Sequence, residues 1–139
     1  MKDPLGFAIG GYNAAHAVEY DVMAKDQHMK PLDRRKCLPC EGGVKPLSSK
    51  EIKSHLCSMP NWRYDAKEKT IRAEVKTKDF MSAIRMIRKI ARLAERAGHH
   101  PDLHLTGYRH LAIVLTTHAI QGLSINDLIL AAKIDKITG

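Results

Sequence analysis

Apolar residues recur every three or four positions between Thr77 and Gly98, the longest periodic run in the chain. This period predicts a long amphipathic helix with Thr77 as its N-cap, Asp79 in its first turn and Gly98 as a left-handed C-cap. Arginines and lysines crowd the opposite side, which we interpret as a solvent-facing surface. Other elements have to cover the apolar stripe, which consists of Phe80, Ile84, Ile87, Ala91 and Ala94.

A strand hairpin is predicted on each side of this helix. The first hairpin spans residues 62–75 and turns at residues 65–69, where lysines and an aspartate interrupt the β-forming residues. The second hairpin spans residues 101–118 and turns near Gly107 and Tyr108. The long helix therefore lies between two pairs of antiparallel strands along the chain.

Two shorter helices are predicted from capping boxes. Ser48 with Glu51 starts the first, and Ser124 with Asp127 starts the last. The predicted order is helix, strand, strand, helix, strand, strand, helix. Such an order is typical of an α+β domain in which a four-stranded antiparallel sheet carries its helices on one face. We place this domain at residues 46–139.

Residues 1–45 lack sustained periodicity and are interrupted by glycines and prolines, so we predict a poorly ordered N-terminal extension. Within it, Cys37 and Cys40 have the spacing of half a zinc site or of a redox pair, with His55 and Cys57 as the nearest further ligands. His55 and Cys57 lie two positions apart on a predicted helix and so face different ways. Unliganded thiols are therefore favoured, and no metal site is predicted.

The 139-residue chain carries a formal net charge of +8, but its cations are spread along the sequence. We therefore expect no nucleic-acid partner. No run approaches eighteen consecutive apolar residues, so no membrane partner is expected either. An odd set of three cysteines without a signal-peptide pattern favours a reducing compartment, the cytoplasm. Organellar targeting by residues 1–45 is left open.

Two adjacent histidines, His99 and His100, directly follow the predicted helix end at Gly98. An antiparallel hairpin returns the chain to the edge where it began, so His118 is expected near this pair. Asp127, in the first turn of the last helix, is expected to reach the same corner and orient one imidazole. The sequence thus predicts a cluster of imidazoles with one carboxylate.

Three interpretations of this cluster are open. A metal site is disfavoured because adjacent side chains in extended backbone point to opposite sides. General acid–base catalysis suits imidazoles, which gain and lose protons near neutral pH. In the plainest interpretation, His99 and His100 only cap the preceding helix, His118 is a hydrogen-bonded loop residue and Asp127 is only a helix cap.

The segments "ERAGHHPDL" and "TTHAIQGLSINDL", with Tyr108 between them, resemble the signature of the pterin-4a-carbinolamine dehydratases. The resemblance covers about Pro46 to Asp135, since "PLSSKEI", "MPNW" and "KTKDFMSAIRMI" also resemble segments of that family, and it leaves the first 45 residues outside. The signature positions are filled by Glu95, His99, His100, Pro101, Tyr108, His118 and Asp127.

The resemblance implies a hydro-lyase, a 4a-hydroxytetrahydrobiopterin dehydratase. Such an enzyme converts 4a-hydroxytetrahydropterin to quinonoid dihydropterin during tetrahydrobiopterin recycling, with no metal and no cofactor. It also implies His99, His100 and His118 as catalytic residues. The substrate-binding residues that it implies are Glu95, Pro101, Thr116, Thr117 and Asp127.

The same resemblance implies a homo-oligomer, either a dimer or a dimer of dimers. It also leaves a second function open, because some members of the family act as non-catalytic coactivators or assembly factors. Such a role would use the helical face to bind a protein partner and would not require the histidines.

Overall fold

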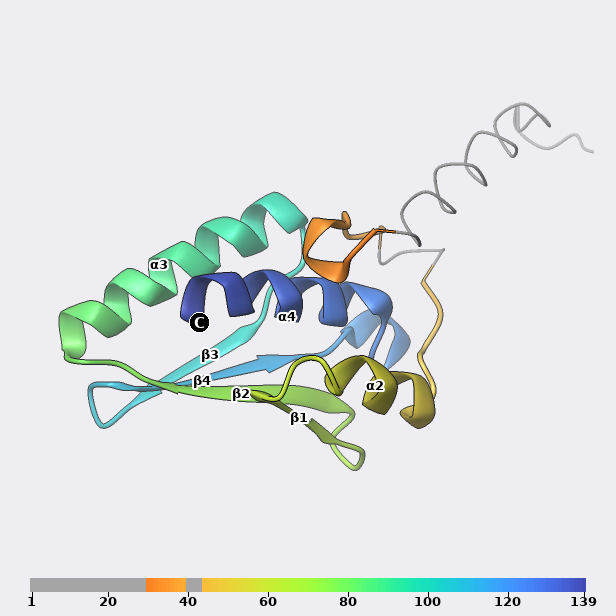
Figure 1. Ribbon diagram of the computed structural model, residues 1–139, viewed down its shortest axis with the longest axis horizontal. Helices are drawn as coiled ribbons and strands as arrows, with labels where there is room; N and C mark the ends of the chain where they lie inside the picture. The colour runs from red at the N-terminus through yellow and green to blue at the C-terminus, as the bar shows by residue number, and fades with distance from the viewer. Residues whose placement is uncertain (1–29, 40–43) are drawn as a thin grey trace, which may run out of the picture. The chain divides into compact units, whose positions relative to one another are not determined.

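Four antiparallel strands form one sheet in the order β1-β2-β4-β3 (Figure 1). The computed structural model describes residues 30–39 and 44–139. The strands are β1 (Trp62–Asp65), β2 (Thr70–Lys76), β3 (Asp102–Thr106) and β4 (His110–Leu115). Both predicted hairpins are confirmed, and β2 pairs with β4 in the middle of the sheet. β1 and β3 are therefore the edge strands.

Three α-helices pack on one face of this sheet: α2 (Ser49–Leu56), α3 (Phe80–Ala97) and α4 (Ile125–Thr138). α3 and α4 contact each other across that face (Figure 1). Two short 3-10 turns, η1 (Leu32–Arg34) and η2 (His118–Ile120), complete the described elements. The predicted α+β class and the order of its helices and strands are confirmed. Within the described ranges, no helix is long and apolar enough to cross a membrane.

The core lies between β4 and α4. Leu111, Ile113 and Leu115 are buried at every second position of β4, as strand alternation requires. Leu128 and Ile134 of α4 are fully buried in the same cluster. Burial of one such side chain stabilises the fold by about 1.5–3 kcal/mol. This core fixes the last strand and the last helix, whose neighbouring ends carry part of the predicted site.

α3 begins two residues later than predicted. Its N-cap is Asp79, whose carboxylate accepts the Ser82 N–H at 2.7 Å. Thr77 is buried, and its N–H donates to the Arg109 carbonyl at 2.9 Å. This bond ties Thr77 to the second hairpin, so the helix starts only after it. The predicted left-handed C-cap at Gly98 is confirmed.

The buried face of α3 is rotated from the predicted stripe. Ala83, Ile90 and Ala94 are buried, whereas Ala91 is exposed and Phe80 is 50% exposed. The helix carries apolar residues on two adjacent faces, and periodicity alone does not say which of them meets the sheet. Packing against the sheet and α4 determines the choice.

Residues 32–39 lie within the segment predicted as an extension, and here they pack against α4. Leu32 contacts the hydrophobic core, and the backbone of Leu38 is hydrogen-bonded to Asn126. Residues 1–29 and 40–43, Cys40 among them, lie outside the described residues. The domain boundary between positions 45 and 46 stays a prediction.

Candidate active site

His99 is buried at the end of α3, with its ring against Asp127. Gly98 has a φ of 66°, which ends the helix and turns the chain toward β3. The His99 side chain is only 7% exposed, and its Nε2 lies 2.6 Å from Oδ1 of Asp127. The predicted approach of Asp127 to the histidine pair is therefore confirmed for His99.

Asp127 is a fully buried carboxylate that joins three parts of the chain. Its Oδ1 contacts His99, while its Oδ2 accepts the Thr117 hydroxyl at 2.7 Å and the Ser124 N–H at 2.9 Å. It lies in the first turn of α4. We assign the proton shared with His99 to Nε2, because a carboxylate only accepts hydrogen bonds.

Thr117 and Ser124 support Asp127 from behind. Their hydroxyl oxygens lie 2.8 Å apart, and since Thr117 donates to Asp127, Ser124 donates to Thr117. The backbone N–H of Thr117 donates to the Gly122 carbonyl at 2.9 Å. Sequence reasoning identified Ser124 as a helix cap but missed its part in this network, which depends on contact with β4.

His100 points away from His99, as expected for neighbours in extended backbone. Its side chain is 61% exposed, and its Nε2 contacts Oε1 of Glu95 in the last turn of α3. Glu95 is 75% exposed. The two adjacent histidines thus each meet a carboxylate, one buried and one at the surface.

Strand register brings Thr117, the residue before His118, to the same corner. Asp102 of β3 lies opposite Val114 of β4, and three further residues of this register place His99 opposite Thr117. His99 and Thr117 indeed share Asp127. His118 follows as the first residue of η2 and is exposed.

The His118 ring has no hydrogen bond to any residue in the described part of the chain. This differs from the plainest interpretation, in which His118 is a hydrogen-bonded loop residue. An exposed imidazole without an internal partner has both ring nitrogens available to a bound molecule.

The two other predicted site residues flank this cluster. Pro101 is half-buried and directly precedes β3. The Thr116 hydroxyl donates to the Lys69 carbonyl at 2.8 Å, which ties the end of β4 to the turn of the first hairpin. Substrate contacts of both residues stay a prediction.

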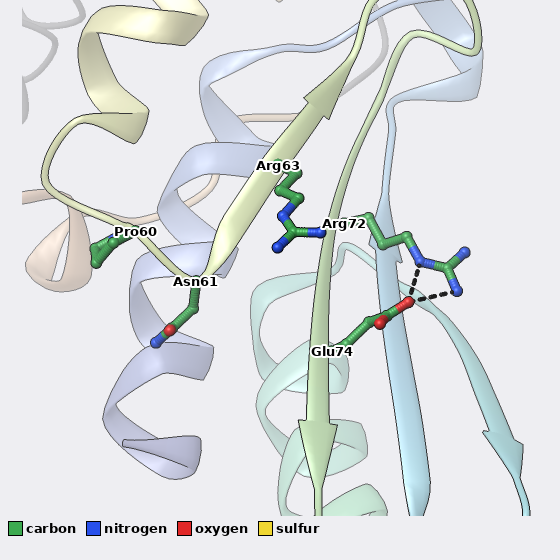
Figure 2. A pocket seen from close by; sticks show the side chains of 5 residues that line it. All are labelled: Pro60, Asn61, Arg63, Arg72 and Glu74. Carbon is green, nitrogen blue, oxygen red and sulfur yellow. Dashed lines mark hydrogen bonds and ion pairs between the residues drawn. The ribbon is translucent and has the colours of Figure 1, made fainter.

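Figure 2 shows side chains that line a hollow beside β1 and β2. It measures about 210 Å³ and is lined by Arg63, Arg72 and Glu74, with Arg72 bound to Glu74 at 3.0 Å. It lies on β1 and β2, while the histidine pair adjoins the opposite edge strand, β3. A larger cavity of about 420 Å³ is bordered by Ile120 and Gln121, close behind His118 in the chain. That volume lies within the ordinary range for ligand pockets, about 300–1,000 Å³.

Metal ligands do not gather in the described part of the chain. No group of three or more histidine, cysteine, aspartate or glutamate side chains there is placed to hold an ion. Neither Cys37 nor Cys57 forms a disulfide within the described residues. The arrangement around His99 offers hydrogen bonding and proton transfer.

Comparisons with known proteins agree with the sequence signature. The chain matches the family model for pterin 4 alpha carbinolamine dehydratase over residues 45–137. A Rickettsia bellii protein is 43% identical over 104 residues, which are 75% of this chain and 91% of that protein. A Nitrosospira multiformis protein is 39% identical over 112 residues, 81% of this chain and 96% of that protein. Both carry the name pterin-4-alpha-carbinolamine dehydratase.

A solved structure of a protein named as a pterin dehydratase is also similar to this chain. The crystal structure of a transcriptional coactivator/pterin dehydratase from Brucella melitensis has a TM-score of 0.64 and 27% identity to this chain, of which it covers 68%. All of that chain is matched.

The alignment with the Nitrosospira multiformis protein covers 112 residues, more than the 95 residues from position 45 to position 139. The sequence similarity therefore extends into the segment before residue 45.

Proposed function

This chain belongs to the pterin 4 alpha carbinolamine dehydratase family, and we propose that His99, His100 and His118 carry out its dehydration by general acid–base catalysis. The enzyme is a hydro-lyase. The proposed substrate is 4a-hydroxytetrahydropterin, the proposed product is quinonoid dihydropterin, and the proposed role is the recycling of tetrahydrobiopterin.

The reaction needs two proton transfers and no electron acceptor. The bond between C4a and its hydroxyl oxygen breaks, and the oxygen leaves as water after receiving a proton. The proton on N5 is removed, and its electron pair forms the new double bond between N5 and C4a. One protonated imidazole and one neutral imidazole supply both transfers. The overall change is the loss of one water.

The observation that carries this proposal is the sharing of Asp127 by His99 and Thr117. Asp127 holds the buried His99 ring in one orientation, and Thr117, which shares Asp127, directly precedes the exposed His118. A carboxylate behind an imidazole fixes its tautomer and orientation, which is the arrangement that proton transfer requires. The register of β3 and β4, continued by three residues, is in keeping with His99 lying beside Thr117.

The remaining residues have proposed roles around the substrate. Glu95 holds His100, and Pro101 and Thr116 border the corner from β3 and β4. Asp127 orients His99 by a direct hydrogen bond, and Thr117 in turn holds Asp127 by a hydrogen bond from its hydroxyl. No metal or cofactor is proposed. The proposed compartment is the cytoplasm, in keeping with two cysteines that form no disulfide within the described residues.

A direct assay of quinonoid dihydropterin formation from a synthetic carbinolamine tests the function. His118→Ala is expected to lower kcat by at least about 100-fold, the usual contribution of a general acid or base. His104→Ala is the matched control, since His104 is an exposed histidine on β3. The control keeps its activity, and so does enzyme treated with a chelator. Unchanged turnover in His118→Ala contradicts the proposal.

A second candidate function is protein binding through the helical face. It is favoured by the Brucella melitensis structure, whose name includes a transcriptional coactivator. Phe80 and Met81 at the start of α3 are 50% and 57% exposed, which provides an apolar contact surface for a partner or a second copy.

We propose a homo-oligomer that uses this surface. Phe80→Ser is expected to weaken self-association in analytical ultracentrifugation, while His118→Ala leaves it unchanged.

A further inference from the structure

A short segment, Leu32–Leu38, runs along α4, and we call it the strap (orange in Figure 1). Near the C-terminal end of α4, Asp33 Oδ2 lies 3.5 Å from Lys136 Nζ. Near the N-terminal end, Leu38 is bound to Asn126. These two helix positions are ten residues apart, which is about 15 Å along the helix axis. The strap therefore lies against α4, and the long Lys136 side chain reaches Asp33 from the C-terminal end of the helix.

Asn126 holds the strap with both ends of its amide. The Leu38 N–H donates to Asn126 Oδ1 at 2.7 Å, and Asn126 Nδ2 donates to the Leu38 carbonyl at 2.6 Å. The Asn126 side chain is fully buried. A buried amide has to be hydrogen-bonded, and here the backbone of one strap residue satisfies both its donor and its acceptor. The two partners are 88 residues apart in sequence.

Asn126 is directly connected to the candidate site. It immediately precedes Asp127, and its backbone N–H donates to the Ser124 hydroxyl at 3.2 Å. That hydroxyl meets Thr117, which in turn donates to Asp127. A displacement of Asn126 is therefore expected to move Asp127 in two ways: through the peptide bond that joins them, and through the hydroxyl groups of Ser124 and Thr117.

We infer that the strap positions the His99–Asp127 pair, with Leu38 acting through Asn126. Without the Leu38 backbone, the buried amide of Asn126 loses these two hydrogen bonds, and the first turn of α4 shifts as the amide adjusts. A shift of a fraction of an ångström in Asp127 reorients the His99 ring. Leu38 and Asn126 are positioning residues and touch neither the substrate nor the reacting atoms. An effect of the strap on dehydration turnover rests on the proposed function, whereas its effect on the orientation of the His99 ring does not.

Leu38→Pro in the full chain tests the inference, because proline lacks the N–H that Asn126 accepts. Residue 38 already precedes Pro39 and is restricted to extended conformations. Leu38→Ala is the matched control, since it loses the same side chain but keeps both backbone groups. Two readouts are needed: kcat and KM for dehydration, and the ¹⁵N NMR signals of the His99 ring nitrogens.

Leu38→Pro is expected to lower kcat about ten-fold with KM changed less than two-fold. Its His99 signals are expected to shift toward those of Asp127→Asn, while Leu38→Ala retains wild-type values. Unchanged His99 signals in Leu38→Pro overturn the inference, and so does equal behaviour of the two variants. If Leu38→Pro does not fold, Asn126→Asp replaces it, because the carboxylate keeps the acceptor for Leu38 but loses the donor. An enzyme without dehydratase activity would refute the proposed function, and the NMR signals would still decide the inference.

Discussion

The Nε2 atom of His99 lies 2.6 Å from Oδ1 of Asp127, and both side chains are shielded from solvent. The other carboxylate oxygen is occupied by Thr117 and Ser124. Asp127 therefore has one oxygen for the imidazole and one for the scaffold. The orientation of the His99 imidazole therefore depends on one buried side chain, that of Asp127.

Replacing Asp127 by asparagine is expected to lower kcat by at least about 100-fold. The amide oxygen can still accept from Thr117 and Ser124, but the amide nitrogen then faces His99 Nε2 and opposes its N–H. The ring has to change its tautomer or its orientation. Steady-state kinetics of carbinolamine dehydration measure this effect, and urea unfolding is expected to show a loss of about 1–3 kcal/mol.

The control for this variant is Asp102→Asn. Asp102 is an exposed aspartate at the start of β3, three positions from His99. It is expected to retain kcat within about two-fold and stability within about 0.5 kcal/mol. Wild-type kcat in Asp127→Asn would show that the buried carboxylate does not serve the imidazole.

The surface pair of Glu95 and His100 is expected to behave differently from the buried pair. Both side chains are mostly exposed, so water screens their attraction. Glu95→Gln is expected to change the free energy of unfolding by less than about 1 kcal/mol and to reduce kcat less than Asp127→Asn does. The same kinetic and urea measurements apply. A stability loss larger than that of Asp127→Asn would contradict this ranking.

Much of the fold could be predicted because its signals are local. Capping boxes at Ser48 and Ser124 and the left-handed Gly98 each depend on residues within a few positions, and all three are present. The approach of Asp127 to His99 was also predictable, since an antiparallel hairpin returns the chain to its starting edge.

The features that sequence reasoning missed depend on distant contacts. The Asn126 amide binds Leu38 across 88 positions, and no local pattern marks either residue. The start of α3 moved from Thr77 to Asp79 because Thr77 binds Arg109 of the second hairpin. The predicted apolar stripe of α3 was wrong at Phe80 and Ala91, which are exposed, whereas Ala94 is buried and Ile87 packs against the core. The helix offers two apolar faces, and only packing against the sheet and α4 selects between them.

Gly98→Ala is expected to destabilise the protein by about 1–2 kcal/mol through backbone conformation alone. The residue has a φ of 66°, while a Cβ there would have no atom within 4 Å. Gly122→Ala is the control, because its Cβ would meet its nearest neighbours at 3.8 Å and its φ is not left-handed. Urea unfolding of both variants measures the difference. Equal stability of Gly98→Ala and the wild type would show that the turn before His99 does not need glycine.

Asp135→Asn is expected to stabilise the protein at pH 7 and to have little effect at pH 3. Burial raises the pKa of the Asp135 carboxyl above its usual range, and the hydrogen bond from Trp62 Nε1, at 2.9 Å, offsets this only in part. The folded state then binds the proton more tightly than the unfolded state. The ionised carboxylate therefore costs stability above the folded pKa, and this cost disappears as the pH falls below the unfolded value of about 3.9. Asparagine keeps the acceptor for Trp62 without the charge, so thermal unfolding at the two pH values should show a gain at pH 7 only. A loss of stability at pH 7 would mean that the charge itself strengthens the bond to Trp62 by more than burial costs.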